Sequence, residues 1–228
     1  MKTVIFGHRG YPAKFTENSL EGFRYALEHG AEGVEFDVQL TKDSVPIVMH
    51  DEKVDRTTDG QGWVKDFTLA EIRQLHLANG EPVPELKELF GVLENHDLLI
   101  NLEFKTSIVH YPGIEKTVFD LAKQYQFVHP IIFSSFDYVT LKNCQELDPT
   151  GTYCYLVDQK VMNPRKLIEE NHFAGIHPGE YFDDDAIVQR IWTVDDPELA
   201  KKYFAHHIAG MFTNNYPAMI KLRDEIQK

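Results

Sequence analysis

Charged side chains follow apolar stretches of this sequence at three points, and their types could support acid–base and metal chemistry. His8 and Arg9 come directly after residues 4–7, whose β-branched and aromatic side chains predict a buried strand. Because charged side chains belong at strand ends only where those ends form a site, the pattern indicates an enzyme. The same arrangement recurs at Glu35-Phe36-Asp37 and at Glu103-Phe104-Lys105.

Side chains alternate along a strand, so Glu35 and Asp37 share one face, and Glu103 and Lys105 share one face of another strand. Three carboxylates that converge repel one another, since two unit charges about 4 Å apart cost roughly 4 kcal/mol at an effective dielectric constant of 20. Ion pairs with Arg9 and Lys105 are one remedy. Protonation of the acids and a hard divalent cation, Mg²⁺ or Ca²⁺, are the other two, and oxygen ligands favour such a cation over zinc. Because two strands carry the same pattern, the sequence favours a cation held by Glu35, Asp37 and Glu103.

His8 and His50 each end a predicted strand beside a charged residue, and a pair of imidazoles can act as general acid and general base near pH 7. Zinc ligation is less favoured, because no local spacing of histidine and cysteine supports it. Arg9 and Lys105 add fixed positive charge that suits a phosphate group. Together these residues predict a site for phosphoryl transfer. Eight of the other nine histidines are interpreted as surface or helix-end residues, and His177 is placed only as the last residue of a predicted strand.

Strand-like and helix-like stretches alternate along nearly the whole chain, in about eight strand-then-helix units. This pattern predicts a (β/α)₈ TIM barrel rather than an open sheet, and the stretch 7–10 is not a dinucleotide fingerprint. Residues 51–84 break the rhythm and are interpreted as a small insertion after the second strand, within a single domain of residues 1–228. The predicted strands span 4–7, 33–39, 46–50, 98–103, 130–134, 152–157, 174–177, 190–194 and 209–213. The predicted helices span 19–29, 68–75, 85–94, 113–126, 138–146, 164–171, 183–189, 197–206 and 217–227.

The net charge and the apolar stretches of the chain limit the kinds of molecule that it is expected to bind. A net charge of −13 argues against nucleic acid and against anionic membranes, so a phosphate-bearing substrate needs a local basic pocket. No stretch approaches the roughly 20 apolar residues that a membrane span needs, and the first strand starts too early to leave room for a signal peptide. A cytoplasmic location is therefore expected. Cys144 and Cys154 are interpreted as small buried hydrophobic residues.

The ordered set of motifs resembles the glycerophosphodiester phosphodiesterase family, over nearly the whole chain. The matching motifs are His8-Arg9-Gly10, Glu17-Asn18-Ser19, Glu35-Phe36-Asp37-Val38, His50-Asp51, Arg56-Thr57-Thr58-Asp59-Gly60, Glu103-Phe104-Lys105, Ser134-Ser135-Phe136, Trp192-Thr193-Val194 and Thr213-Asn214.

This resemblance implies a TIM barrel with an insertion at about residues 51–84, and metal-dependent hydrolysis of a glycerophosphodiester to glycerol 3-phosphate and an alcohol. Glu17 would lie near the metal or a substrate hydroxyl, and Trp192 would form an apolar wall for the glycerol or the leaving alcohol. The resemblance does not say which histidine is the acid. The other implied roles are metal ligation by Glu35, Asp37 and Glu103, acid–base catalysis by His8 and His50, and phosphate binding by Arg9 and Lys105.

Two residues depart from the family pattern: Asp195 stands where asparagine is frequent, and Asn214 stands where aspartate is common. Both could alter substrate preference. Two other functions stay open: a lysophospholipase D-type hydrolase, for which Trp63 and Phe67 are scattered apolar candidates, and a non-catalytic barrel that binds phosphate. The expected partner is a small-molecule glycerophosphodiester, without a stable membrane anchor, and a homodimer is possible.

Overall fold

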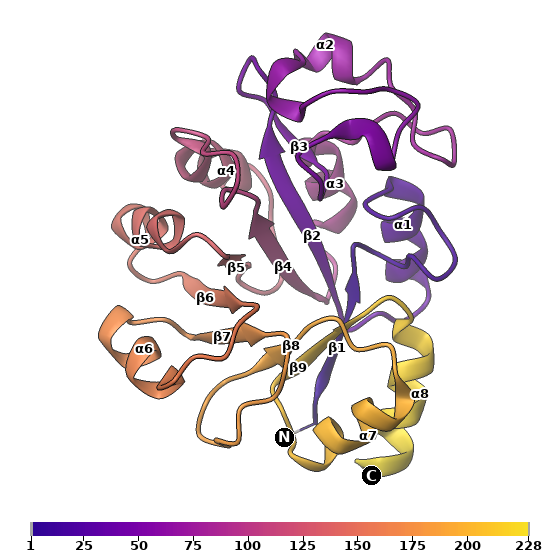
Figure 1. Ribbon diagram of the computed structural model, residues 1–228. Helices are drawn as coiled ribbons and strands as arrows, with labels where there is room; N and C mark the ends of the chain where they lie inside the picture. The colour runs from indigo at the N-terminus through magenta and orange to yellow at the C-terminus, as the bar shows by residue number, and fades with distance from the viewer. Residues whose placement is uncertain (1, 228) are drawn as a thin grey trace.

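The computed structural model describes residues 2–227, and within them eight parallel strands form a barrel surrounded by helices (Figure 1). The order around the barrel is β7-β6-β5-β4-β2-β1-β9-β8, and a parallel bridge between Ile176 and Gln189 closes it between β7 and β8. The predicted (β/α)₈ barrel is therefore confirmed. The strands are β1 Val4–His8, β2 Gly33–Leu40, β4 Leu99–Phe104, β5 Ile132–Ser135, β6 Thr152–Val157, β7 Gly175–Pro178, β8 Arg190–Ile191 and β9 Gly210–Thr213.

Most of the outer helices begin where the sequence offers a capping side chain or an early proline, and one instead follows Gly113. Ser19 accepts a hydrogen bond from the backbone N–H of Gly22 at the start of the first helix, and Asn163 caps a helix that begins with Pro164. Six of these helices bury apolar side chains, whereas the one that begins with Pro164 has no fully buried residue. The helices are α1 Leu20–Glu28, α3 Leu86–Leu93, α4 Ile114–Ala122, α5 Tyr138–Leu147, α6 Pro164–Asn171, α7 Pro197–Ala205 and α8 Tyr216–Ile226.

The register between strands decides which side chains meet inside the barrel. His8 of β1 pairs with Glu35 of β2, and Asp37 of β2 pairs with Glu103 of β4. The residues between them on β2, such as Phe36, are fully buried on the opposite, helix-covered face. Alternation and register together therefore collect the polar side chains at the carboxyl ends of neighbouring strands.

The segment 51–84 lies at the end of β2, beyond the short antiparallel strand β3 (Pro46–Val48) (Figure 1). It contains two 3₁₀ turns, η1 (Val54–Arg56) and η2 (Val64–Asp66), and the short helix α2 (Leu69–Ile72). It packs around a small core separate from the main one, formed by Ile47, Met49, Val54, Val64, Ile72, Leu77 and Val83.

The helix expected at 183–189 was wrong, since residues 183–187 form turns and bends instead. The carboxylate of Asp184 binds Arg165 and the backbone N–H of Ala186, which stabilises a turn. The backbone of Val188 is engaged in closing the barrel, because its carbonyl accepts from the N–H of Ile176. The strand expected at 190–194 is also shorter, since β8 has only two residues.

Candidate active site

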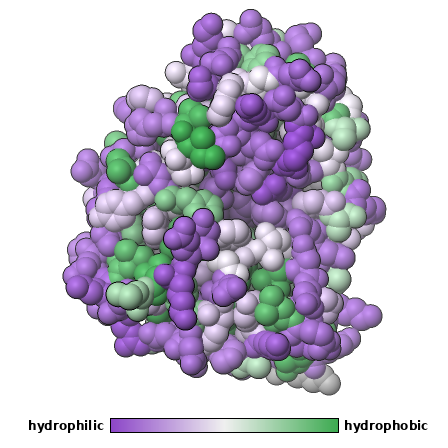
Figure 2. All heavy atoms as spheres, viewed as in Figure 1, coloured by the Kyte–Doolittle hydropathy of each residue, from purple (hydrophilic) through white to green (hydrophobic). Residues whose placement is uncertain are grey.

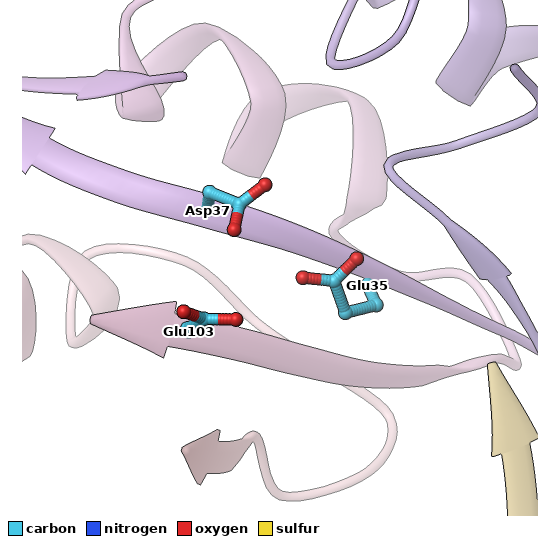
Figure 3. A group of neighbouring side chains, drawn as sticks. All are labelled: Glu35, Asp37 and Glu103. Carbon is cyan, nitrogen blue, oxygen red and sulfur yellow. The ribbon is translucent and has the colours of Figure 1, made fainter. Parts of the chain in front are cut away.

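Three carboxylates converge inside the barrel mouth. Glu35 and Asp37 project from β2 and Glu103 from the neighbouring β4, and Figure 3 shows their carboxyl groups turned toward one another. One oxygen of each lies within 4.8 Å of the others, and all three side chains are buried.

Burial and mutual repulsion shift the pKa values of these three carboxyl groups. Burial raises the pKa of Glu35 well above its ordinary value, and the charges of Asp37 and Glu103 raise it further. Burial also raises the pKa of Glu103, although Lys105 opposes the shift. Burial acts on Asp37 in the same sense, but nearby cationic side chains, Arg9 and Lys105 among them, hold its pKa below the ordinary value. The raised pKa values mean that burial and mutual repulsion disfavour the charged carboxylates, and a bound cation would relieve this.

Ion pairs with side chains account for two of the three acids. The ammonium Nζ of Lys105 lies 2.8 Å from Glu103 Oε1, and Arg9 Nε lies 3.5 Å from Asp37 Oδ2. Glu35 accepts only the backbone N–H of Arg9, at 3.0 Å, and within residues 2–227 no lysine or arginine side chain pairs with it. The buried oxygen Asp37 Oδ1 lies 4.0 Å from Lys105 Nζ and has no hydrogen-bond partner among the described residues. An all-oxygen set with one orphaned oxygen and mutually repelling carboxylates fits a hard divalent cation.

His8, at the end of β1, is held in one tautomer. Its Nδ1 lies 2.8 Å from Asn214 Oδ1, and the Asn214 amide nitrogen donates to Asp195 Oδ2 at 2.6 Å. A carboxylate only accepts, so Asp195 orients the amide and leaves its oxygen facing the imidazole. Nδ1 then carries the proton and Nε2, 3.9 Å from Glu35, carries a lone pair. Burial, together with Arg9, lowers the pKa of His8 to about 4. Asp195 and Asn214, the two residues expected to depart from the family pattern, thus lie in direct contact.

His50 has a charged partner instead. Its Nδ1 lies 2.7 Å from Asp51 Oδ1, and Arg56 binds that carboxylate with Nε 2.6 Å from Oδ2. Arg56 also binds Glu17 at 2.8 Å, and Glu17 binds Arg9 at 2.9 Å. The hydrogen bonds from Arg56 hold the pKa of Asp51 well below its ordinary value, and the two arginines lower that of Glu17 against the effect of burial. Glu17 therefore links two arginines and does not belong to the three-carboxylate group.

A cavity of about 150 Å³ opens beside these groups, lined by both histidines and walled by Phe136 and Trp192. The two aromatic rings meet edge to face with centroids 5.4 Å apart, and the indole N–H of Trp192 donates to the carbonyl of His177 at 2.6 Å. Lys105 lies in an adjoining groove of about 660 Å³, which His50 and Phe136 also line. The site thus has a narrow interior and a wider approach.

Three buried polar residues of the cavity received no role from the sequence: Ser134, which occurs only within a matching motif, Asn101 and His177. The sequence did contain a pattern that could have indicated Asn101 and His177. Asn101 lies two residues before Glu103, on the same face of the strand, and His177 is near the end of a predicted strand as His8 is. Asn18, which donates to Asp37 Oδ2 at 3.0 Å, came from the motifs but without a partner.

Comparison with known proteins identifies the class. Residues 8–217 match the model of the glycerophosphoryl diester phosphodiesterase family. The chain is 35% identical over 238 residues to the glycerophosphodiester phosphodiesterase of Caldanaerobacter subterraneus subsp. tengcongensis, covering 97% of this chain and 98% of that protein. It is 31% identical to the glycerophosphodiester phosphodiesterase of Bacillus altitudinis, covering 99% of this chain and 100% of that protein.

A solved structure agrees with these relatives. A phosphodiesterase of Oleispira antarctica in complex with the product sn-glycerol-3-phosphate superposes with a TM-score of 0.88 at 26% identity, over 98% of this chain and 97% of that one. Fold and site together define a barrel phosphodiesterase. The chain belongs to the glycerophosphoryl diester phosphodiesterase family, and the predicted family and enzyme class are confirmed.

Proposed function

We propose that this chain hydrolyses glycerophosphodiesters to sn-glycerol 3-phosphate and an alcohol in the cavity at the barrel mouth. The observation that carries the proposal is the group of three buried carboxylates beside two histidines with different partners. Membership of the family and the relatives named above support the same reaction.

Glu35, Asp37 and Glu103 would hold a divalent cation, Mg²⁺ or Ca²⁺, because their oxygens are the donors that both ions prefer. Such a cation, when bound, lowers the pKa of a coordinated hydroxyl and neutralises charge that develops on phosphoryl oxygens.

The side chains of this chain then divide the remaining work. Arg9 and Lys105 bind the phosphate oxygens. Nε2 of His8 takes the proton of the glycerol C2 hydroxyl as its oxygen attacks phosphorus, and His50 donates a proton to the departing alcohol oxygen. A cyclic phosphate results. Water opens it with the proton transfers reversed: His50 accepts a proton from water, and His8 returns one to the C2 oxygen.

The surroundings of the site favour a small polar substrate over a lysophospholipid. Hydrophilic residues cover most of the face in Figure 2, and its apolar residues lie in separate patches. Phe67 packs against the small core of segment 51–84. The ring of Trp63 is covered by Lys53, whose Nζ lies 5.2 Å from the ring centroid. Neither aromatic residue lines the cavity or the adjoining groove.

No helix within residues 2–227 has the length and apolar character that crossing a membrane requires. A cytoplasmic location stays a proposal, supported by the acidic composition and by the two free, buried thiols of Cys144 and Cys154. The homodimer stays a prediction.

The test is the release of sn-glycerol 3-phosphate from glycerophosphocholine, with and without EDTA. We expect EDTA to lower turnover at least about 100-fold, because metal-ion stabilisation is worth several kcal/mol, and Mg²⁺ or Ca²⁺ to restore it. Glu103→Gln should lower turnover similarly, whereas Glu146→Gln, an exposed change on α5, should not. Turnover indifferent to EDTA would contradict the metal, and binding without turnover in every ion would favour the non-catalytic barrel.

A further inference from the structure

The interior of the active-site cavity holds polar groups that the mechanism above does not use. His177 is fully buried, lines the cavity, and has no hydrogen-bond partner at either ring nitrogen among the described residues. The buried Oδ1 of Asn101, which lines the same cavity, also has no partner there. Buried polar atoms are nearly always hydrogen-bonded, so unpartnered ones in a cavity wall indicate that a ligand group binds them.

The ring of His177 lies on the floor of this cavity. It packs on Phe212 with ring centroids 5.1 Å apart, and Phe212 packs on Phe6 at 5.0 Å. Phe6 precedes His8 by two residues on β1, so it points into the barrel one layer deeper. Phe212 therefore closes the cavity below the catalytic histidine, and a group that reaches His177 belongs to the inner end of the substrate.

The chemistry of these atoms suits a hydroxyl group. Burial, with Arg190 adding to it, lowers the pKa of His177 well below its ordinary value, so the ring is neutral and offers one donor and one acceptor. The Asn101 amide nitrogen donates to Ser134 Oγ at 2.9 Å, which leaves its oxygen as an acceptor. A neutral donor and two acceptors match an alcohol and offer nothing to balance the charge of a phosphate.

The walls suit a short carbon chain. Trp192 and Leu156 line the cavity with Phe136, and the bond from the Trp192 indole to the His177 carbonyl fixes the indole beside the floor. Apolar walls above a polar, closed floor are complementary to a three-carbon chain that ends in a hydroxyl.

We propose that His177 and Asn101 bind the free terminal hydroxyl, at C1, of the glycerol moiety, and that the enzyme therefore selects glycerophosphodiesters whose C1 oxygen carries no acyl group. An acyl ester at C1 removes the hydroxyl proton and directs a hydrocarbon chain against the closed floor, so lysophospholipids are excluded. This inference rests on the proposed function for the orientation of the substrate, with phosphate at the mouth and C1 inside.

The test compares glycerophosphocholine with propane-1,2-diol phosphocholine, which keeps the C2 hydroxyl that attacks phosphorus and lacks only the C1 hydroxyl. A site built to bind a hydroxyl leaves its own buried groups unpaired with such an analogue, so we expect wild-type kcat/KM to be about 100-fold lower on it. His177→Phe should lower kcat/KM on glycerophosphocholine by about the same factor. It should change kcat/KM on the analogue less than about threefold, so that the variant no longer discriminates between the two substrates.

Two variants separate binding from structural damage. His177→Asn keeps a donor and an acceptor and should retain most of the discrimination. Ile176→Val lies on the same strand with its side chain on the opposite face, and should leave the discrimination unchanged. A short-chain 1-acyl lysophosphatidylcholine, monomeric in solution, should be hydrolysed at least 100-fold more slowly than glycerophosphocholine.

The outcomes for the proposed function and for this inference are distinct. If the wild type hydrolyses neither diester, the proposed function fails, but calorimetric binding of sn-glycerol 3-phosphate against propane-1,2-diol phosphate still decides whether the C1 hydroxyl is recognised. If His177→Phe does not fold, the wild-type comparison of the two substrates decides. Equal kcat/KM and equal affinity with and without the hydroxyl, unchanged discrimination in a folded His177→Phe, or rapid hydrolysis of the acylated substrate each overturn the inference.

Discussion

At the scale of single residues, the two catalytic histidines of the proposal differ in what binds their Nδ1 atoms. The amide oxygen of Asn214 holds His8 with its Nδ1 protonated and adds no charge. The carboxylate of Asp51 binds Nδ1 of His50 in the same position but places a negative charge beside that ring. The lowered pKa of His8 suits a base that starts neutral, and the other imidazole, beside a carboxylate, is assigned the acid.

This division of roles predicts different responses to the leaving group. On glycerophosphocholine, His8→Ala and His50→Ala should each lower turnover by about 10² to 10⁴. On glycerol 3-(p-nitrophenyl) phosphate the leaving group departs as a stable phenolate and needs no proton. Rapid-mixing measurement of p-nitrophenolate in the first turnover should therefore show His50→Ala within about tenfold of wild type, and His8→Ala still impaired.

His96→Ala, which changes an exposed histidine, serves as the control and should behave as wild type on both substrates. If His8→Ala, and not His50→Ala, has a near-wild-type rate on the p-nitrophenyl substrate, the assigned roles are reversed. If both variants remain impaired on the p-nitrophenyl substrate, this would contradict proton donation to the leaving alcohol by either histidine.

At the scale of elements, the sequence predicts what local patterns determine. The strand β6 and the helix α6 have the predicted bounds, because an apolar run defines the first and the cap at Asn163 with Pro164 defines the second. The predicted helix 183–189 fails because residues 188 and 189 bond to a strand that is close in space, and no local pattern reports that. The carboxylates were found because alternation is local, whereas the link from Arg56 to Glu17 spans 39 residues and needed the fold.

Arg56 ties segment 51–84 to the loop before α1, and this link predicts a pH-dependent stability. Arg56 lowers the pKa of both Asp51 and Glu17 in the folded protein. A depressed carboxyl pKa stabilises the fold above the unfolded value, near 4, and that stabilisation is lost as the pH falls through the folded value. Arg56→Met should therefore destabilise the protein at pH 7 by about 1 kcal/mol, because the arginine is half exposed and solvent screens it.

Urea unfolding of Arg56→Met and wild type between pH 7 and pH 3 measures this effect. The difference in the free energy of unfolding should be largest at pH 7 and should shrink below about pH 4. Lys65→Met removes an exposed ion pair with Asp66 in the same segment. Its free energy of unfolding should match that of the wild type at each pH. A difference that stays constant across this range would mean that Arg56 stabilises the segment by packing and not by charge.

At the scale of the whole molecule, a buried arginine joins the C-terminal helix to the first two strands. Arg223 of α8 is 1% exposed and donates to the carbonyl of Thr3 at 2.6 Å and to Glu32 Oε1 at 2.7 Å. Glu32, which precedes β2, also accepts the backbone N–H of Ile5 at 3.0 Å. One guanidinium therefore connects the start of β1, the start of β2 and the last helix.

Loss of this guanidinium should weaken the whole barrel without touching the site. Arg223→Met keeps much of the apolar stem but removes the partner of the Thr3 carbonyl and of Glu32. We expect a cost of about 3 kcal/mol, at the lower end for a buried pair, because the side chain of Glu32 is 34% exposed and solvent screens it. For a chain of this length that loss corresponds to a fall in Tm of roughly 6–12 °C. Arg165→Met removes an exposed bidentate pair with Asp184 and should cost less than about 1 kcal/mol. Calorimetric melting of the two variants checks this, with kcat at 25 °C expected to be unchanged in both. Equal Tm values would show that the barrel does not depend on this arginine for its stability.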